Sequence, residues 1–173
     1  KNLFYNVPAR RRFLKSPNTE LKHIITEFQR VALCHPEVGF SLFHNNAEIY
    51  QLSPSGRRER IVQVMGRQLD SNLVNIQIET SIVQINGFIG KPEKAKKTYG
   101  EQFFFVNDRF MKHPYFHRAV LRSYESILPP DTVPSYFIFL DLDPSHVDIN
   151  IHPTKTEIKF DEERAIFQFL HAS

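Results

Sequence analysis

Helix-like and strand-like hydrophobic patterns alternate along this chain, and the alternation restricts it to a mixed α/β fold. Apolar residues between Leu21 and Ala32 have the spacing of an amphipathic helix, after a helix start at Ser16-Pro17. The run from Tyr136 to Leu142 is a strongly apolar strand. Counting all such segments predicts about seven strands and three or four helices.

The other predicted elements follow from turn residues and proline positions. Asn45-Asn46 is the turn of a hairpin, and Asn107-Asp108-Arg109 is a second turn. Strands are predicted at 3–7, 40–43, 48–52, 73–79, 82–89, 103–106 and 147–151, the last either paired with 136–142 or beside it. Helices are predicted at 58–65, closed by Gly66, at 114–128, with inner residues 116, 119, 120, 123, 124 and 127, and after Asp161.

Length and composition fit one domain with at most a small appendage, because the chain has 173 residues of which 41% are hydrophobic. The single cysteine, Cys34, excludes an internal disulfide framework and lies in an apolar helical pattern, so we expect a buried, inert thiol. No apolar run approaches the roughly 20 residues of a membrane span. The start at Lys1 rather than Met suggests a piece of a longer protein.

Positive charge gathers in four clusters, although the formal net charge is only +3. Clusters of this kind are typical of proteins with an anionic partner, nucleic acid first, but any one of them is more often a solvated face or loop. For the four clusters together the two interpretations are about equal. The clusters are Arg10, Arg11, Arg12 and Lys15; Arg57, Arg58, Arg60 and Arg67; Lys91, Lys94, Lys96 and Lys97; and Arg109, Lys112, Arg118 and Arg122.

Residues 147–160 (VDINIHPTKTEIKF) carry the most specific chemistry. The segment begins with strand alternation and meets Pro153, which cannot donate a ladder hydrogen bond. Lys155 then follows on a stiffened strand end, where an ammonium group suits a phosphate. Asp148, Asn150 and His152 share one strand face, but without a second His or Cys at ligand spacing we prefer a polar strand face to a metal site.

Catalytic patterns are otherwise lacking in the sequence. Asp141 and Asp143 could form a carboxylate pair, but a strand end approaching solvent is the commoner arrangement. The chain has only six glycines and no glycine-rich phosphate loop. We therefore expect no nucleotide to be held by this chain alone.

Three sequence blocks resemble the MutL-type DNA mismatch repair proteins. Residues 6–15 (NVPARRRFLK) are similar to the family block N-x-P-A-R-x-K-F-L, and residues 106–109 (VNDR) to its V-N-x-R turn. Residues 147–160 are similar to its V-D-[VI]-N-[VI]-H-P-x-K-x-E-[VI]-x-F block. The blocks occur in the family's order and span nearly the whole chain.

The resemblance implies a transducer subdomain with a ribosomal protein S5 domain 2-like fold, a mixed sheet packed by helices. Residues 1–35 would be the tail end of a GHKL-type ATP-binding domain and a connecting helix, and 36–173 the transducer. Lys155 would reach the γ-phosphate of ATP, with His152 and Pro153 shaping its loop. The implied DNA contacts are Arg10, Arg11, Arg12, Arg109, Lys112, Arg118 and Arg122.

The same resemblance implies ATP with Mg²⁺ in the intact protein and no cofactor bound by this chain alone. It implies DNA, the upstream ATP-binding domain, a MutL homodimer and a MutS-type mismatch sensor as partners, and no membrane. The expected location is the bacterial cytoplasm, at the nucleoid. Without the GHKL motifs the chain itself is expected to be catalytically inert.

Two departures from the family pattern affect these expectations. Asp108 stands where glycine is common in the turn, and Pro114 stands where some relatives carry a basic residue, which would weaken a DNA groove there. The alternative function is a stand-alone nucleic-acid-binding S5-like module. A piece of a type II topoisomerase or of Hsp90 ranks lower, since those proteins lack the first and third blocks together.

Overall fold

The computed structural model describes residues 4–148 and 158–172 of the chain. The helices are α1 (Pro8–Arg11), α2 (Pro17–Cys34), α3 (Arg57–Met65), α4 (Pro114–Ser123) and α5 (Glu163–Ala172). The strands are β1 (Phe40–His44), β2 (Ala47–Leu52), β3 (Leu73–Glu79), β4 (Gln84–Gly90), β5 (Gln102–Val106), β6 (Arg109–Met111), β7 (Tyr136–Asp141), β8 (Val147–Asp148) and β9 (Lys159–Phe160). Short 3₁₀ turns are η1 (Arg67–Asn72), η2 (Pro92–Lys94) and η3 (Pro144–His146).

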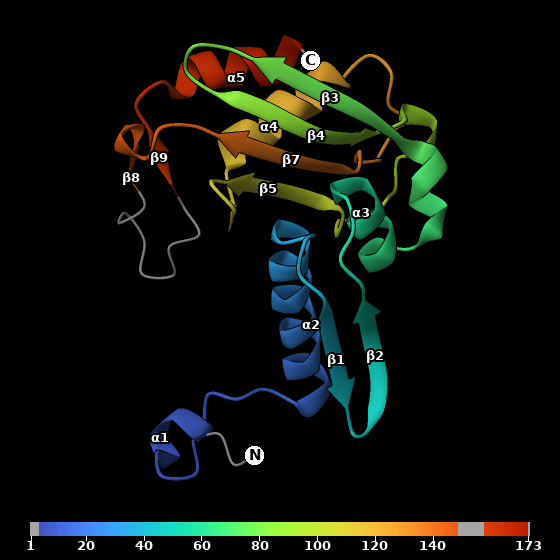
Figure 1. Cartoon of the computed structure of the whole chain (residues 1–173), viewed down its shortest axis with the longest axis vertical. Coiled ribbons are helices and arrows are strands. Elements are labelled where there is room, and N and C mark those ends of the chain that lie inside the picture. The colour runs from blue at the N-terminus through green and yellow to red at the C-terminus, as the bar shows by residue number, and fades with distance from the viewer. Residues whose placement is uncertain (1–3, 149–157, 173) are drawn as a thin grey trace.

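A five-stranded mixed sheet in the order β3-β4-β7-β5-β6 is the centre of the fold. Within this sheet β5 and β7 run parallel, with Phe104 opposite Ile138, and the other neighbours are antiparallel. Parallel neighbours need a crossover, which the segment containing α4 provides. Helices α4 and α5 cover one face of the sheet, whereas α3 and the end of α2 lie on the other (Figure 1).

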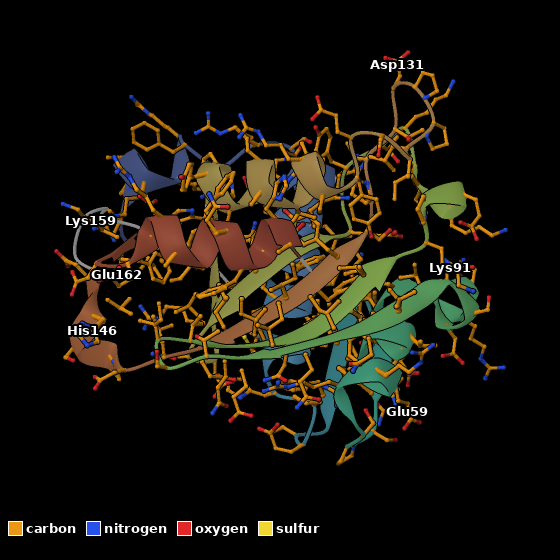
Figure 2. All side chains as sticks on the ribbon, turned by 90° about the horizontal axis from the view of Figure 1, so that it is seen from above. Glu59, Lys91, Asp131, His146, Lys159 and Glu162 are labelled. Carbon is orange, nitrogen blue, oxygen red and sulfur yellow. The ribbon has the colours of Figure 1, made fainter. Side chains whose placement is uncertain are left out.

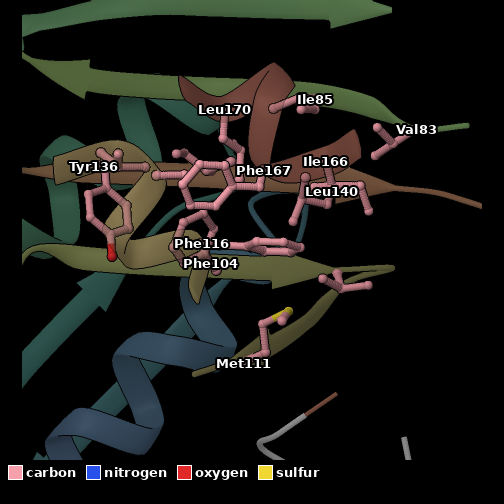
Figure 3. Packing of buried hydrophobic residues seen from close by; sticks show 14 of the residues in the cluster. Val83, Ile85, Phe104, Met111, Phe116, Tyr136, Leu140, Ile166, Phe167 and Leu170 are labelled. Carbon is pink, nitrogen blue, oxygen red and sulfur yellow. The ribbon is translucent and has the colours of Figure 1, made fainter. Parts of the chain in front are cut away.

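Both faces of the sheet are buried, so its central strands are continuous apolar runs. Phe104 and Ile138 pack toward α4 and α5, together with Phe116 and Phe167 (Figure 3). The alternate residues of the same two strands, Phe103, Phe105, Phe137 and Phe139, pack with Leu33 and Ile61 on the opposite face. The phenylalanine-rich composition thus fills two cores that share one sheet.

The hairpin β1–β2 and most of α2 project away from the sheet (Figure 1). Ser16 caps α2 by accepting from the Thr19 backbone N–H, as the predicted helix start requires, and the helix ends at Cys34. Asn45 and Asn46 both have positive φ, the geometry that a two-residue hairpin turn requires. The predicted hairpin is therefore confirmed.

Three predicted elements, those at 3–7, 114–128 and 147–151, are wrong in part. Residues 4–6 form a turn, not a strand end, because Phe4 has a φ of 62° and its carbonyl accepts from the Val7 N–H. Helix α4 ends at Ser123, whose hydroxyl returns to the Val120 carbonyl, so Ile127 is 55% exposed rather than on an inner face.

The strand expected at 147–151 pairs with β9, not with β7. Val147 lies opposite Phe160, and Asp148 opposite Lys159. Strand β7 already has β4 on one side and β5 on the other, so neither of its edges is free for a further strand. The two-stranded β8–β9 ladder lies beyond the end of β7 (Figure 1).

Candidate functional site: the flanks of residues 149–157 and the basic side chains

The predicted phosphate-contacting residues Lys155, His152 and Pro153 lie outside the described residues, but both flanks of their segment are described. The chain enters through β8 and returns through Ile158 and β9. Ile158 and Phe160 are each only 3% exposed, within the core that contains Phe116. This burial fixes the returning flank against α4.

A second set of contacts joins the two flanks directly. The Asp161 backbone N–H donates to the His146 carbonyl at 3.2 Å, and the Asp161 carboxylate lies 3.1 Å from Nδ1 of the His146 ring. Figure 2 shows His146, Lys159 and Glu162 at the same end of the molecule, beside the start of α5. The helix predicted directly after Asp161 begins at Glu163, so Asp161 joins the two flanks and is not the residue that caps α5.

His113 links these flanks to α4. Its Nδ1 accepts from the Phe116 N–H at 3.2 Å, as the N-cap of α4, so Nε2 carries the ring proton. Nε2 lies 3.1 Å from the Glu163 carboxylate, and the backbone of Ile158 also contacts the ring. Burial lowers the His113 pKa from 6.5 to about 4, against the weaker opposite effect of the Ile158 backbone.

His113 is not among the site residues that the sequence predicts. A signal was available, because proline at the first helical position, Pro114, makes the preceding residue the N-cap. The buried contacts of the ring with Phe116 and Phe160 depend on tertiary packing and have no local signal.

The arginines of the predicted DNA surface lie on separate elements of the fold. Arg10 and Arg11 are on α1 and Arg12 is its C-cap, all exposed. Arg118 and Arg122 lie one turn apart on α4, exposed, with guanidinium groups 5.6 Å from the Tyr115 ring and 5.8 Å from the Phe167 ring. Helix α1 lies at the opposite end of the long axis from α4, so the structure does not unite these groups (Figure 1).

Arg109 and Lys112 lie on the edge of the sheet, where both are exposed. Arg109 begins β6 directly after the turn, in which Asn107 and Asp108 both have positive φ. Lys112 follows β6 and lines a groove beside the start of α4. The seven predicted DNA-binding residues therefore lie in three places: at α1, at the edge strand β6 and on α4.

The second basic cluster (Arg57, Arg58, Arg60 and Arg67) does not form one exposed surface for an anion, so that prediction is wrong. Arg60 is fully buried, and its guanidinium donates to five backbone carbonyls, those of Ala32, His35, Pro36, Val38 and Ser53. It neutralises the carbonyl-rich end of α2 and holds the following turn. Arg58 pairs with Asp70 at 2.9 Å, and the Arg57 guanidinium lies 4.5 Å from the Phe139 ring.

The third cluster is partly engaged within the domain. Lys91 Nζ donates to the Ser71 carbonyl at 2.9 Å, and Lys96 pairs with Glu101.

The carboxylate of Asp143 accepts from the Ser145 N–H and hydroxyl, which lowers its pKa and identifies it as a turn cap. Cys34 is 5% exposed, and burial raises its pKa to about 12, so the predicted inert thiol is confirmed.

Within residues 4–148 and 158–172, no group of three or more His, Cys, Asp or Glu side chains is arranged to hold a metal ion. None of the helices in these two ranges has the length and apolar character needed to span a bilayer.

Comparisons with known proteins agree with this architecture. Residues 61–173 match the family described as "DNA mismatch repair protein, C-terminal domain". The DNA mismatch repair protein MutL of Parabacteroides distasonis is 54% identical, and that of Christiangramia forsetii 57%, each over 173 residues. The chain is covered completely in both alignments but spans only 28% of each relative.

Two solved structures share the fold. "Crystal Structure of N terminal domain of a DNA repair protein" aligns with a TM-score of 0.81 at 21% identity, over 99% of this chain and 57% of that one. "Aquifex aeolicus MutL ATPase domain complexed with ADP" aligns with a TM-score of 0.65 at 21% identity, over 100% of this chain and 56% of that one.

The fold is therefore the mixed α/β architecture found in the N-terminal regions of DNA repair proteins, which confirms the predicted fold class. Because the family match covers more than half of this chain, the chain belongs to the MutL family of DNA mismatch repair proteins.

Proposed function

We propose that this chain acts in DNA mismatch repair as the transducer part of a MutL-type ATPase. The observation that carries the proposal is the match of residues 61–173 to the mismatch repair family, together with a fold shared with a MutL ATPase domain. The matched range includes α4, α5 and both flanks of residues 149–157.

Lys155 is proposed to supply its ammonium group to the γ-phosphate of ATP, with His152 and Pro153 shaping the backbone around it. The buried Ile158 and Phe160 and the His113 contacts support this role, because they anchor the returning flank. A charge-assisted contact of this kind is worth about 1.5–3 kcal/mol. The nucleotide and Mg²⁺ would be held mainly by an ATP-binding domain that adjoins this chain in the full-length protein.

The test is steady-state ATP hydrolysis by the full-length protein carrying Lys155→Ala. Removing a donor to developing charge costs on the order of 10²–10³ in rate, and we expect a fall of this size. Lys159→Ala is the matched control, because Lys159 is an exposed lysine on the neighbouring β9. An unchanged rate in Lys155→Ala, with the fold intact, would contradict the proposed role.

The exposed arginines are proposed to bind DNA while ATP binding drives closure of a MutL homodimer. Arg118 and Arg122 carry this part of the proposal, since they are neighbouring cations on the outer face of α4. Mismatch recognition would come from a MutS-type partner. We place the protein in the bacterial cytoplasm, at the nucleoid.

A second candidate is a nucleic-acid-binding module that acts without an ATPase, which the exposed arginines also favour. A module of this kind would bind duplex DNA as the isolated chain, with a log–log salt slope of about −0.9 per neutralised phosphate. A transducer would bind well only within the full-length protein. DNA titrations of both forms at several salt concentrations therefore separate the two functions.

A further inference from the structure

A groove opens at the edge of the sheet between the start of β5, the segment before it and the start of α4. Its volume is about 340 Å³, close to the lower limit of small-molecule sites, and its walls are mainly aromatic. Its lining includes Phe104 of β5 and Tyr136 of β7, Tyr99 from the segment before β5, and Pro114 and His117 of α4. Strand β6 pairs only with residues 104–106 of β5, so the beginning of β5 has no β6 partner on the side of the groove.

The rings that line the groove form a connected series. Tyr99 lies 6.0 Å from His117, His117 lies 5.9 Å from Tyr136, and Tyr136 lies 4.9 Å from Phe104, measured between ring centroids. Tyr99 is 68% exposed, whereas Tyr136 is 2% exposed and its hydroxyl points away from the buried cluster (Figure 3). The series therefore runs from the core out to an exposed ring.

Several polar atoms of the lining are engaged within the protein. The Tyr136 hydroxyl lies 2.8 Å from His117 Nδ1, and the Gln102 amide donates to the Pro134 carbonyl. Burial raises the pKa of Tyr136 and lowers that of His117, so both rings are neutral at pH 7. The groove thus offers ring faces rather than hydrogen-bonding groups, which suits a flat ring recognised by stacking.

The charge around the groove is positive. Lys112 is the one lysine or arginine among the eight lining residues, which include no carboxylate, and it is exposed. Arg118 follows His117 on α4 and is also exposed. The nearby acids are engaged, since Glu101 pairs with Lys96 and accepts from the Ser135 hydroxyl, and Glu163 contacts His113.

From this combination we propose that the groove binds an unpaired base of single-stranded DNA, stacked on Tyr99, with an adjacent phosphate against Lys112. Aromatic platforms beside cations are the chemistry by which proteins hold single strands without reading their sequence. A paired base in a duplex cannot present its face to such a groove. The inference rests on the proposed DNA-binding function and assigns it a further site.

The experiment measures binding of a fluorescently labelled oligothymidylate to the full-length protein. Loss of one base–aromatic stack predicts roughly a tenfold or larger loss of affinity for Tyr99→Ala, with Tyr99→Phe close to wild type. Lys112→Ala should reduce the salt slope by about 0.7, the value for one phosphate of a single strand. Phe43→Ala is the control, because Phe43 is a 58% exposed ring on the distant β1–β2 hairpin.

A second readout reports stacking itself. Fluorescence of a 2-aminopurine in the oligonucleotide should be quenched on binding to wild type and Tyr99→Phe, and much less on binding to Tyr99→Ala. If Tyr99→Ala binds and quenches like wild type while replacing Arg118 and Arg122 weakens binding, the DNA-binding function stands and the base site is wrong. If the wild-type protein binds duplex DNA but not the oligonucleotide, the base site is again wrong and the DNA-binding function stands; if it binds neither, both are overturned.

Discussion

At the scale of single residues, the same side-chain type has opposite roles in this protein. Arg60 and Arg67 belong to one cluster in the sequence, yet the structure buries Arg60 completely and leaves Arg67 exposed. A buried guanidinium is tolerated because its two terminal amino groups donate to carbonyl oxygens at and just beyond the end of α2. Charge clustering in a sequence cannot distinguish these two situations.

Replacing Arg60 by methionine should lower the free energy of unfolding by about 3 kcal/mol or more, because five carbonyl oxygens lose their donor. Arg60→Lys should be intermediate, since an ammonium cannot reproduce the planar fork. Urea unfolding of both variants measures the effect. The exposed Arg67→Met is the control and should change stability by less than about 0.5 kcal/mol; equal effects at the two positions would exclude the proposed role of Arg60.

The lowered pKa of His113 predicts that the stability of the protein depends on pH. Its pKa is about 4 in the folded protein and 6.5 ordinarily, so between these values the unfolded chain binds more protons and stability falls as pH is lowered. The loss at pH 5 relative to pH 8 should be about 2 kcal/mol from this residue. His117, whose pKa is also lowered, acts in the same direction, whereas the Glu163 carboxylate facing His113 opposes it.

The variant His113→Asn tests this, because asparagine can still cap α4 but cannot titrate. Its unfolding free energy should fall less between pH 8 and pH 5 than that of the wild type. Parallel pH profiles for the two proteins would show that His113 is not the responsible group.

At the scale of elements, the closeness of β4 and β7 depends on a glycine. A Cβ on Gly87, which has a φ of 155°, would lie 2.2 Å from the Phe137 carbonyl oxygen. Gly87 faces Ile138 across the central strand pair, so any side chain there would force the backbones apart. The sequence predicts both strands but not this close approach, because it joins residues far apart along the chain.

Gly87→Ala should therefore destabilise the protein by about 2–3 kcal/mol through overpacking against backbone. Thermal or urea unfolding gives the value. Gly56→Ala is the matched control, because a Cβ at Gly56 meets nothing within 4 Å and Gly56, the N-cap residue of α3, makes no side-chain cap. Its effect should stay below about 1 kcal/mol, and an equally small effect at Gly87 would mean that β4 and β7 can separate at little cost.

At the scale of the whole molecule, the positive charge is divided between the two ends. Arg10 to Arg12 lie near α1, and Arg118 and Arg122 lie on α4, far apart along the long axis (Figure 1). Groups separated in this way should contribute independently to binding. A DNA duplex would have to extend along the molecule to touch both.

The double variant Arg118→Gln, Arg122→Gln should reduce the salt slope of duplex DNA binding by roughly 2, because each phosphate that is no longer neutralised lowers the slope by about 0.9. Adding glutamine at Arg10, Arg11 and Arg12 should weaken binding further by a factor independent of the first pair. Binding isotherms at several salt concentrations measure both effects. An unchanged slope in the double variant would remove α4 from the DNA surface.

The sequence by itself determined the fold class, most element positions and the family. Local patterns are sufficient for these, since a helix cap such as Ser16-Pro17 and turn pairs such as Asn45-Asn46 act over a few residues. Only the tertiary structure decided that β8 pairs with β9, that Arg60 is internal, and that Tyr99, His117 and Tyr136 line one groove. These outcomes depend on which strand edges remain free and on which distant groups meet, and such long-range packing leaves no periodic signal in the chain.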